Sequence, residues 1–342
     1  MSDDDFIPPP QQRSLSISQA ASAYLDSVAL ARSKNTARTY QNGIQVFLLC
    51  LQTNHLDPEK APVASLREDA IGWFSAFLKG YAPTTERLYL TAATGFYEYL
   101  AAEDLLPVNL ARIRMLIRQR ARRPGIRLPQ FPADAIDKII TKITTTRNLD
   151  TLEGVEKLRA LRDRAFLLTL ADTGLRVHEA CGLRRGDLDW PNGQAVIIGK
   201  GNREDIVRFS RRAQAALQAY LTARAAFDGS SGRSLSALPL FARHDKGAGK
   251  KVKPITTATG RNIVTDAVRE ILGEDAVGTI TPHSFRHYFV TRVLRSSNNL
   301  KLAQELARHR NIAVTQRYAH LTNDELDKGF WRAIEEEENK DE

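Results

Sequence analysis

The chain has 342 residues, 42% of them hydrophobic, and a formal net charge of +9. This length allows two domains with buried cores, and the two cysteines, Cys50 and Cys181, are too few for a disulfide-stabilised module. The positive charge favours a polyanion such as nucleic acid as the partner, and the lack of a long apolar run excludes a membrane helix. Residues 1–13 are acidic and then proline-rich, which is typical of a disordered arm and not of a signal peptide, so we expect a cytoplasmic protein.

Residues 14–105 show the apolar periodicity of helices. Four helices are predicted, and they begin near Ser16, Asn35, Ser65 and Pro83, which are residue types common at helix N-termini. Because the connections between them are short, we expect these helices to form a small bundle.

Residues 106–132 are predicted to link this bundle to a second domain. The segment contains four prolines and seven arginines but no acidic residue. A charged run is usually a solvated surface, but a run of one sign between two domains favours a linker that crosses a DNA backbone. The candidate DNA contacts in it are Arg112, Arg114, Arg118, Arg120, Arg122 and Arg123.

The second predicted domain, residues 133–321, begins with a helix capped by Asp134, followed by a polar loop over 147–156. An apolar helix over 158–171 is then expected to end at Gly174, because glycine commonly follows the last helical residue. Further helices are predicted to start at Ser210 and Thr256.

Arg176 opens the next short helix, whose N-terminus itself favours an anion. Glu179 follows one turn later, and it either holds Arg176 in place or forms an ordinary i, i+3 pair. Residues 194–209 contain two β-rich segments around a glycine turn, which predicts a hairpin with Lys200 beside its turn. A lone lysine in such a hairpin is usually only solvated.

Residues 281–320 contain the side chains with the clearest chemistry. His283 and Arg286 lie on one face of the first turn of a predicted helix, and His309 and Tyr318 follow on a later helix pair. A guanidinium binds two phosphate oxygens, an imidazole donates or moves a proton, and an activated tyrosine is a nucleophile. The set favours attack on a phosphate, although surface and packing roles stay open on this stretch alone.

A metal site is the alternative for part of this stretch. His283 and His287 have the i, i+4 spacing of zinc-binding helices, but Ser284 stands where the metalloprotease motif needs a glutamate. We therefore predict no metal, and no other cofactor.

In order and spacing, residues 155–325 resemble the tyrosine recombinases (phage integrase family). The resemblance rests on a Thr-Gly-x-Arg turn, a hairpin lysine, a His-x-x-Arg motif, a second histidine, and a tyrosine nine residues after it. These positions are occupied by Arg176, Lys200, His283, Arg286, His309 and Tyr318. Two positions depart from the family's pattern: Arg308 stands where glycine is usual, and Phe285 where leucine is common.

The resemblance implies a mainly α fold with a small β-hairpin or sheet (α+β). An N-terminal helical bundle would clamp DNA opposite a C-terminal tyrosine-recombinase catalytic domain. It also implies a site-specific DNA recombinase in which Tyr318 attacks the scissile phosphate and forms a 3′-phosphotyrosyl bond, without metal or ATP. Arg176 and Arg286 would stabilise the charge on the phosphate, and Lys200 would protonate the leaving 5′-oxygen.

Other roles are less determined by the sequence. His283 and His309 would either hydrogen-bond the phosphate or take the tyrosine proton, and Glu179 would support Arg176. Arg308 is expected either to contact the DNA backbone or to mark a weakened site. The alternatives to a recombinase are a type IB topoisomerase and a DNA-binding protein that has lost its activity, and Arg308 is the one feature that favours the latter.

Residues 322–342 are predicted to be a docking tail. Leu326, Phe330, Trp331 and Ile334 form one apolar stripe, and an acidic end follows them. The stripe packs either on its own catalytic domain or, as the resemblance implies, on a neighbour in a homo-tetramer that joins two double-stranded DNA sites. The need for accessory proteins stays open.

Overall fold

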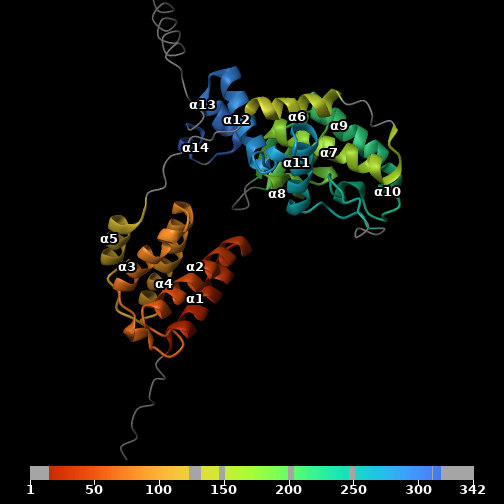
Figure 1. Ribbon diagram of the computed structural model, residues 1–342. Helices are drawn as coiled ribbons and strands as arrows, with labels where there is room; N and C mark the ends of the chain where they lie inside the picture. The colour runs from red at the N-terminus through yellow and green to blue at the C-terminus, as the bar shows by residue number, and fades with distance from the viewer. Residues whose placement is uncertain are drawn as a thin grey trace, which may run out of the picture. The chain divides into compact units, whose positions relative to one another are not determined.

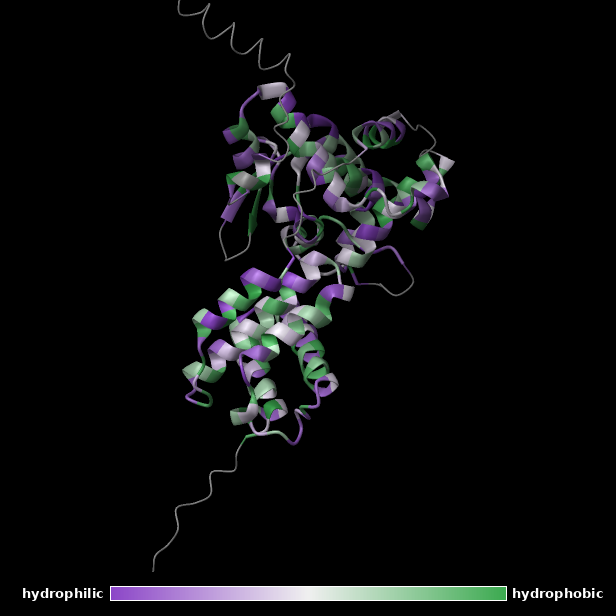
Figure 2. Cartoon of the chain, turned by 60° about the vertical axis from the view of Figure 1, so that its left-hand side comes forward, coloured by the Kyte–Doolittle hydropathy of each residue, from purple (hydrophilic) through white to green (hydrophobic). Residues whose placement is uncertain are grey.

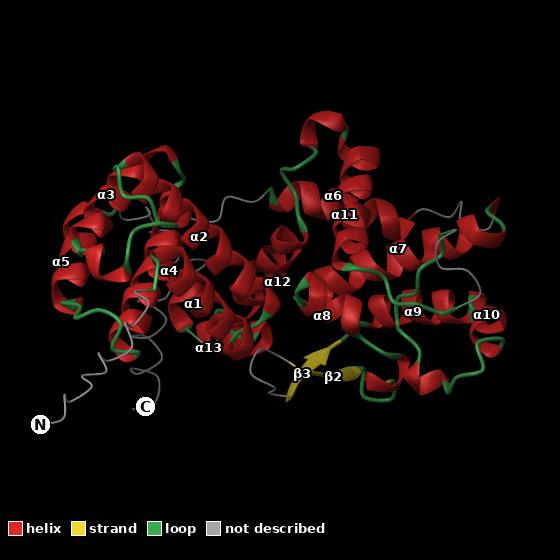
Figure 3. Cartoon of the chain, turned by 90° about the horizontal axis from the view of Figure 1, so that it is seen from below, coloured by secondary structure: helices red, strands yellow, loops and turns green. Residues whose placement is uncertain are grey.

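The computed structural model describes residues 15–122, 132–145, 151–198, 204–245, 251–309 and 311–316 (Figure 1). The chain divides into two compact units, Met1–Ile126 and Arg127–Glu342, and each has its own hydrophobic core. Helices dominate and the sheet is small (Figure 3), which confirms the predicted mainly α fold with a small β element. Within the described ranges, no helix combines the length and the apolar character that crossing a membrane requires.

The described part of the first unit is helical. Its α-helices are α1 (Ile17–Ala31), α2 (Lys34–Thr53), α3 (Asp69–Phe77), α4 (Pro83–Ala102) and α5 (Leu110–Arg120).

Two of the four predicted helices in this unit begin where the sequence predicts. Ser16 caps α1 through a capping box, and Pro83 is the first residue of α4. The other two predicted starts are shifted. Ser33 caps α2 because its hydroxyl accepts from a backbone N–H of the first turn, whereas Ser65 ends a 3-10 turn and α3 begins only at Asp69.

The segment predicted as an open linker, residues 106–132, contains α5, which packs against α3. Ile113 and Leu116 of this helix are buried in the core of the first unit. The boundary expected at residue 105 is therefore too early. The two apolar residues are three positions apart among the arginines, and this spacing forms a narrow buried face on an otherwise basic helix.

Aromatic rings fill the core of the first unit. Phe47 on α2 lies 5.1 Å from Phe74 on α3 and 6.2 Å from Tyr97 on α4, measured between ring centroids, and both pairs are T-shaped. The buried Tyr97 hydroxyl donates to the carbonyl oxygen of Arg67 at 2.6 Å. Figure 2 shows hydrophobic and hydrophilic residues on different sides of these helices, as expected for amphipathic helices around a core.

The second unit combines helices with a three-stranded sheet. Its elements are α6 (Ala133–Thr145), α7 (Gly154–Thr173), α8 (Val177–Gly182), β1 (Leu188–Asp189), β2 (Gln194–Ile198), β3 (Glu204–Arg208), α9 (Arg211–Ala223), α10 (Ala225–Gly229), α11 (Thr257–Leu272), α12 (Pro282–Ser297), α13 (Leu300–Ala307) and α14 (Ile312–Gln316).

The sheet has the strand order β1-β2-β3, and both strand pairs are antiparallel. Ala195 pairs with Val207 on the buried face of the predicted hairpin, and Val196 pairs with Ile206 on its exposed face. β1 was not expected, because a two-residue strand is too short to show a periodic pattern. The hairpin turn, residues 199–203, lies outside the described residues.

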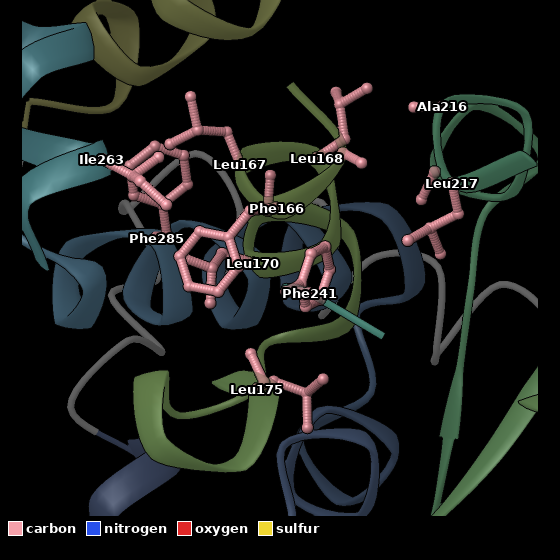
Figure 4. Close-up of a cluster of buried hydrophobic side chains, with 14 of the residues drawn as sticks. Phe166, Leu167, Leu168, Leu170, Leu175, Ala216, Leu217, Phe241, Ile263 and Phe285 are labelled. Atoms are coloured by element: carbon pink, nitrogen blue, oxygen red, sulfur yellow. The ribbon is translucent and has the colours of Figure 1, made fainter. Parts of the chain in front are cut away.

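α7 lies at the centre of the second unit, where it packs against α6, α9, α11 and α12. Phe166 on α7 meets Phe241 edge-on, with 5.1 Å between ring centroids, and Figure 4 shows both rings in one cluster with Leu170 and Phe285. Phe285 belongs to the first turns of α12 and is fully buried. Its burial anchors the helix that holds the neighbouring Arg286.

Several starts in this unit match the sequence and two do not. Ser210 and Thr256 cap α9 and α11 as predicted. α6 begins at Ala133, so Asp134 is in its first turn and is not its cap. α7 begins at Gly154, inside the segment whose sequence predicts a polar loop, because the first turns of this helix face solvent and have a polar composition.

Candidate active site

The turn between α7 and α8 positions the first arginine of the site. Gly174 ends α7 with φ +60°, in the left-handed region that glycine favours. Arg176 is the N-cap of α8, as its place in the sequence predicts, and its backbone N–H donates to Glu179 Oε2 at 2.8 Å. Its Nη1 donates to Glu179 Oε1 at 2.7 Å, while the side chain stays 43% exposed. The guanidinium is thus held on one side and open on the other.

Glu179 is a buried carboxylate, with a side chain only 3% exposed. Burial by itself raises its pKa, but the backbone N–H of Arg176 and the positive charges of Arg308 and Arg176 outweigh burial, so the pKa is lowered. Glu179 is therefore ionised at neutral pH. The geometry fits the holding role for Arg176 better than an exposed i, i+3 pair, because the carboxylate is desolvated and accepts three hydrogen bonds.

Arg286 on α12 is the second arginine, and it is 3% exposed. Its Nη1 donates to the carbonyl oxygen of Gly174 at 2.6 Å, and its Nη2 donates to the carbonyl oxygen of Ala307. Burial and the charges of Arg176 and Arg308 lower the pKa of Arg286 to about 9, so it stays charged at neutral pH. Two backbone carbonyls from different helix ends thus fix this guanidinium in one orientation.

His309 follows α13 and is half-buried. Its Nδ1 lies 2.9 Å from the hydroxyl of the buried Thr315, and its carbonyl oxygen accepts from Gln304 Nε2 at 2.9 Å. Burial and the charges of Arg286 and Arg176 lower the pKa of His309 to about 4. The imidazole is therefore neutral at pH 7, and with Nδ1 occupied it has Nε2 left for a ligand.

Two more histidines lie on α12. His283, in the first turn, is exposed, and its ring centroid is 4.2 Å from that of His287. Burial lowers the pKa of both side chains, and the charge of Arg286 contributes to both shifts; the pKa of His287 falls to about 4. Among the described residues, no group of three His, Cys, Asp or Glu side chains is arranged to hold a metal ion.

Arg308 has an unusual conformation and an unusual partner. It is the C-cap of α13 with φ +55°, a left-handed conformation that is uncommon for any residue but glycine. Its side chain is 6% exposed, and its Nη2 donates to Glu179 Oε2 at 3.0 Å. Its Nε and Nη1 are buried without a hydrogen-bond partner in the described part of the chain. The φ value explains physically why glycine suits this position.

The second unit thus brings together six residues that the sequence singled out, from the N-terminal end of α8, the first turns of α12 and the end of α13. They are Arg176, Glu179, His283, Arg286, Arg308 and His309. Three guanidinium groups face one carboxylate, and the histidines are uncharged at neutral pH, so the cluster has an excess of positive charge. Such a cluster, with open donors on Arg176, is suited to bind a phosphate group.

Other predicted site residues lie outside the described residues, namely Lys200, Tyr318 and Arg123. Their neighbours in the chain are described. β2 ends at Ile198, and α14 ends at Gln316, two positions before the tyrosine. β3 and α13 line a common groove that includes Arg308, Asp205 and Leu302, so the strand that follows the lysine turn lies beside the cluster.

Three of the arginines proposed as DNA contacts on and after α5 form ion pairs within the first unit. Arg112 pairs with Asp69 at 2.7 Å, and Arg114 with Glu98 at 3.5 Å. Arg122 Nε donates to the buried Glu86 at 2.6 Å. Arg118 and Arg120 have exposed side chains. Because exposed ion pairs contribute little, the first two pairs leave both arginines free to exchange partners.

Sequence reasoning missed three features of the site. His287 was considered only as a metal ligand, although its i, i+4 spacing from His283 already placed it on the same helix face. The contact of Thr315 with His309 and that of Arg308 with Glu179 gave no signal, because neither follows from local spacing.

The profile of the Phage integrase family matches residues 134–325 of the chain. Among curated proteins, the tyrosine recombinase XerC of Thermodesulfovibrio yellowstonii is 28% identical over 301 residues, which cover 87% of this chain and 90% of the relative. The tyrosine recombinase XerC of Staphylococcus saprophyticus is 28% identical over 316 residues, which cover 92% and 96%.

Two solved structures with the same fold are complexes with DNA. The integrase of transposon Tn1549 in complex with a circular intermediate DNA superposes with a TM-score of 0.64 at 19% identity, covering 94% of this chain and 100% of that one. The XerH site-specific recombinase bound to its difH substrate gives 0.63 at 18% identity, covering 92% and 84%. These identities are low, so the likeness shows the fold.

Proposed function

The chain belongs to the phage integrase family, and from this premise we propose how its site works. It is a tyrosine-type site-specific recombinase that acts on DNA. The observation on which the mechanism depends is the pair of arginines, Arg176 and Arg286, of which one is open to a ligand and the other is fixed by two carbonyls. The two guanidinium groups hold the non-bridging oxygens of the scissile phosphate.

The arginines stabilise the charge that builds up during the reaction. A guanidinium has five N–H donors, and Arg286 uses one from each of two nitrogens for backbone carbonyls, which leaves donors for phosphate oxygens. Because these groups are oriented before the substrate binds, little reorganisation is needed when the pentacoordinate phosphorus forms. The positions of the two arginines support the proposal that their side chains stabilise the negative charge on the phosphate.

In the proposed reaction, the oxygen of Tyr318 attacks the phosphorus and forms a 3′-phosphotyrosyl bond. The bond from phosphorus to the 5′-oxygen breaks, and Lys200 gives a proton to that oxygen. One phosphate ester replaces another of similar energy, so no ATP is consumed. Attack by a 5′-hydroxyl of a partner strand reverses these steps and joins the strands.

A neutral histidine takes the proton of Tyr318 or hydrogen-bonds the phosphate. The lowered pKa values of His283 and His309 keep both imidazoles uncharged at neutral pH, and an uncharged imidazole has one nitrogen that accepts a proton and one N–H that donates to a phosphate oxygen. His309 is the better-fixed of the two, since Thr315 holds its Nδ1 and so orients Nε2. His283 is exposed and less restrained.

The assembly is a homo-tetramer on two DNA sites in the cytoplasm, and residues 322–342 dock on a neighbouring protomer. The apolar stripe of this segment supports the docking, since an exposed stripe would favour aggregation. The arginines on and after α5 contact the DNA backbone, together with Arg123, and exchange their intramolecular partners for phosphates.

Type IB topoisomerase activity is not favoured, because the curated relatives are recombinases by name. One experiment separates the readings. A duplex site is recovered from a random-sequence pool by binding, and it is then presented as a nicked suicide substrate and as paired sites. A recombinase gives a covalent adduct on the first and exchanged strands on the second. A topoisomerase gives the adduct alone, and an inactive binding protein gives neither.

A further inference from the structure

Arg308 shares a carboxylate with Arg176, although the two arginines come from different helices. Glu179 Oε2 accepts from Arg308 Nη2 at 3.0 Å and from the backbone N–H of Arg176 at 2.8 Å, and its Oε1 accepts from Arg176 Nη1 at 2.7 Å. The side chains of Arg308 and Glu179 are 6% and 3% exposed, so this pair is shielded from solvent. Charges interact more strongly there than at the surface.

The shared carboxylate changes the charge balance of the site. With Arg176 as its only partner, Glu179 would cancel much of the charge that this arginine presents to a phosphate. With Arg308 as a second buried partner, the charge of Arg308 balances the carboxylate, and the charge of Arg176 stays available. Arg176 is the one with an open side, since it is 43% exposed.

The conformation of Arg308 is strained, which indicates that its contact with Glu179 has a role that offsets this strain. The residue has φ +55°, where an L side chain is disfavoured, and two of its guanidinium nitrogens are buried without partners among the described residues. Both features destabilise the fold, and glycine would remove both. An arginine that only packs here would have no evident advantage over glycine.

We propose that Arg308 is a positioning residue that neutralises Glu179 and so leaves the charge of Arg176 available for the scissile phosphate. The proposal rests on the proposed function, and it adds a residue that acts through another and does not itself touch the DNA. Substitution of Arg308 is therefore expected to lower the rate of cleavage without preventing formation of the covalent adduct.

The first test is single-turnover cleavage of the suicide duplex by Arg308→Gly and Arg308→Lys. The glycine variant is expected to be roughly ten-fold slower, less than the loss for a direct oxyanion donor. The lysine variant keeps a positive charge beside Glu179 and is expected to stay within about three-fold of the parent. Should the glycine variant fail to fold, Arg308→Gln replaces it in the comparison with lysine.

The matched control is Asn298→Gly. Asn298 is the C-cap of α12 with φ +49°, so this variant also places glycine at a left-handed helix end, without changing the charge of the site. It is expected to cleave at the parental rate. If Arg308→Gly cleaves as fast as this control, or if lysine is no better than the neutral variant, the positioning role is wrong.

A double-mutant cycle with Glu179→Gln tests the path through the carboxylate. In the parent, the glutamine amide would turn an N–H donor towards Arg308 or Arg176, so a loss of rate is expected. In the Arg308→Gly background, the same change removes a negative charge that Arg176 alone balances, and it is expected to harm cleavage much less or to raise the rate. Additive effects of the two changes would overturn the proposal.

A substrate with a methylphosphonate at the scissile position adds a readout that a purely structural role would not change. Its uncharged linkage needs less positive charge, so the difference between the parent and Arg308→Gly is expected to shrink to within about three-fold. An equal ten-fold deficit on both substrates would contradict the charge argument. If the unmutated protein forms no covalent adduct on any substrate, the proposed function fails, and that result is distinct from a failure of the role of Arg308.

Discussion

The Nη1 of Arg286 donates to the carbonyl oxygen of Gly174, 2.6 Å away and 112 residues earlier in the chain. This contact joins the first turns of α12 to the turn that precedes Arg176, and so it fixes the two arginines of the site relative to each other. Gly174 also lies against Phe289 on α12, where an added Cβ would come within 2.4 Å of the ring. The close approach and the φ of +60° both require glycine.

Substitution at this glycine is expected to damage both stability and activity. Gly174→Ala combines strain in the left-handed region, about 1–2 kcal/mol, with overpacking against Phe289, about 1–3 kcal/mol. The matched control is Gly154→Ala, because Gly154 has φ +55° but no heavy atom within 4 Å of the added Cβ. Denaturant unfolding should show a clearly larger loss for Gly174→Ala, and equal losses would mean that the contact with Phe289 relaxes at no cost.

The arginines should be needed for cleavage. Arg176→Ala and Arg286→Ala are each expected to reduce single-turnover cleavage by at least about two orders of magnitude, the usual size for losing one preorganised donor. Lysine should rescue poorly, because an ammonium lacks the two-pronged geometry. Arg292→Ala, on the exposed side of α12, is the control and should cleave nearly normally. Cleavage within a few-fold of the parent in either site variant would mean that the phosphate binds elsewhere.

The sequence singled out residues that the second unit brings together, but it did not reveal the contacts between them. Arg176, His283, Arg286 and His309 were recognisable because the residue types recur in a fixed order, and the helix starts at Arg176 and Thr281-Pro282 follow from local capping. The contacts that orient them were not recognisable. The Arg308–Glu179 pair joins residues 129 positions apart, and a contact at that separation leaves no periodic pattern.

For the fold, too, the sequence predicts some helices at their observed positions and misplaces others. Amphipathic periodicity locates most helices, but the sequence of α5 indicates a linker because its two buried residues are outnumbered by arginines. The start of α3 was placed at Ser65 because a serine before an apolar run resembles a cap, whereas a 3-10 turn intervenes. In both cases the tertiary packing of a short segment decided the structure, and local composition did not reveal it.

Acid should destabilise the second unit through its buried histidines. Burial, with nearby positive charges, lowers the pKa of His244, His287 and His309 from 6.5 to about 4. The folded state therefore binds fewer protons than the unfolded state in this range, so stability is full above pH 6.5 and falls as the pH drops towards 4. Glu179, whose pKa is lowered from 4.5, loses its contribution to stability only as the pH falls below about 4.5.

Thermal unfolding of the full chain at pH 7.5, 6 and 5 checks this expectation. The melting temperature should decrease across the series, and His244→Gln, which removes one of the titrating groups away from the site, should make the decrease smaller. His244 Nε2 lies 2.8 Å from the buried hydroxyl of Tyr220, and glutamine can keep a hydrogen bond there. A melting temperature that is unchanged between pH 7.5 and pH 5 would contradict the assignment of buried neutral histidines.

The docking tail gives a prediction that concerns assembly. Deleting residues 324–342 should leave binding to a single half-site intact, because the deleted segment is acidic and is not expected to touch DNA. Cooperative filling of paired half-sites and synapsis should weaken, since the apolar stripe would no longer join neighbours. Gel-shift titration of one-arm and two-arm sites measures both, and unchanged cooperativity in the truncated protein would exclude the exchange.

Covalent capture of DNA by Tyr318 is the most direct test of the central claim. On a nicked suicide duplex, the unmutated protein should form a protein–DNA adduct, and Tyr318→Phe should bind the duplex with similar affinity and form none, because only the attacking hydroxyl is lost. Tyr288→Phe is the control, since the Tyr288 hydroxyl is occupied in a 2.6 Å hydrogen bond to Asp137, and this variant should still form the adduct. An adduct with the Tyr318→Phe protein, or its loss only in the Tyr288→Phe protein, would contradict the assignment of the nucleophile.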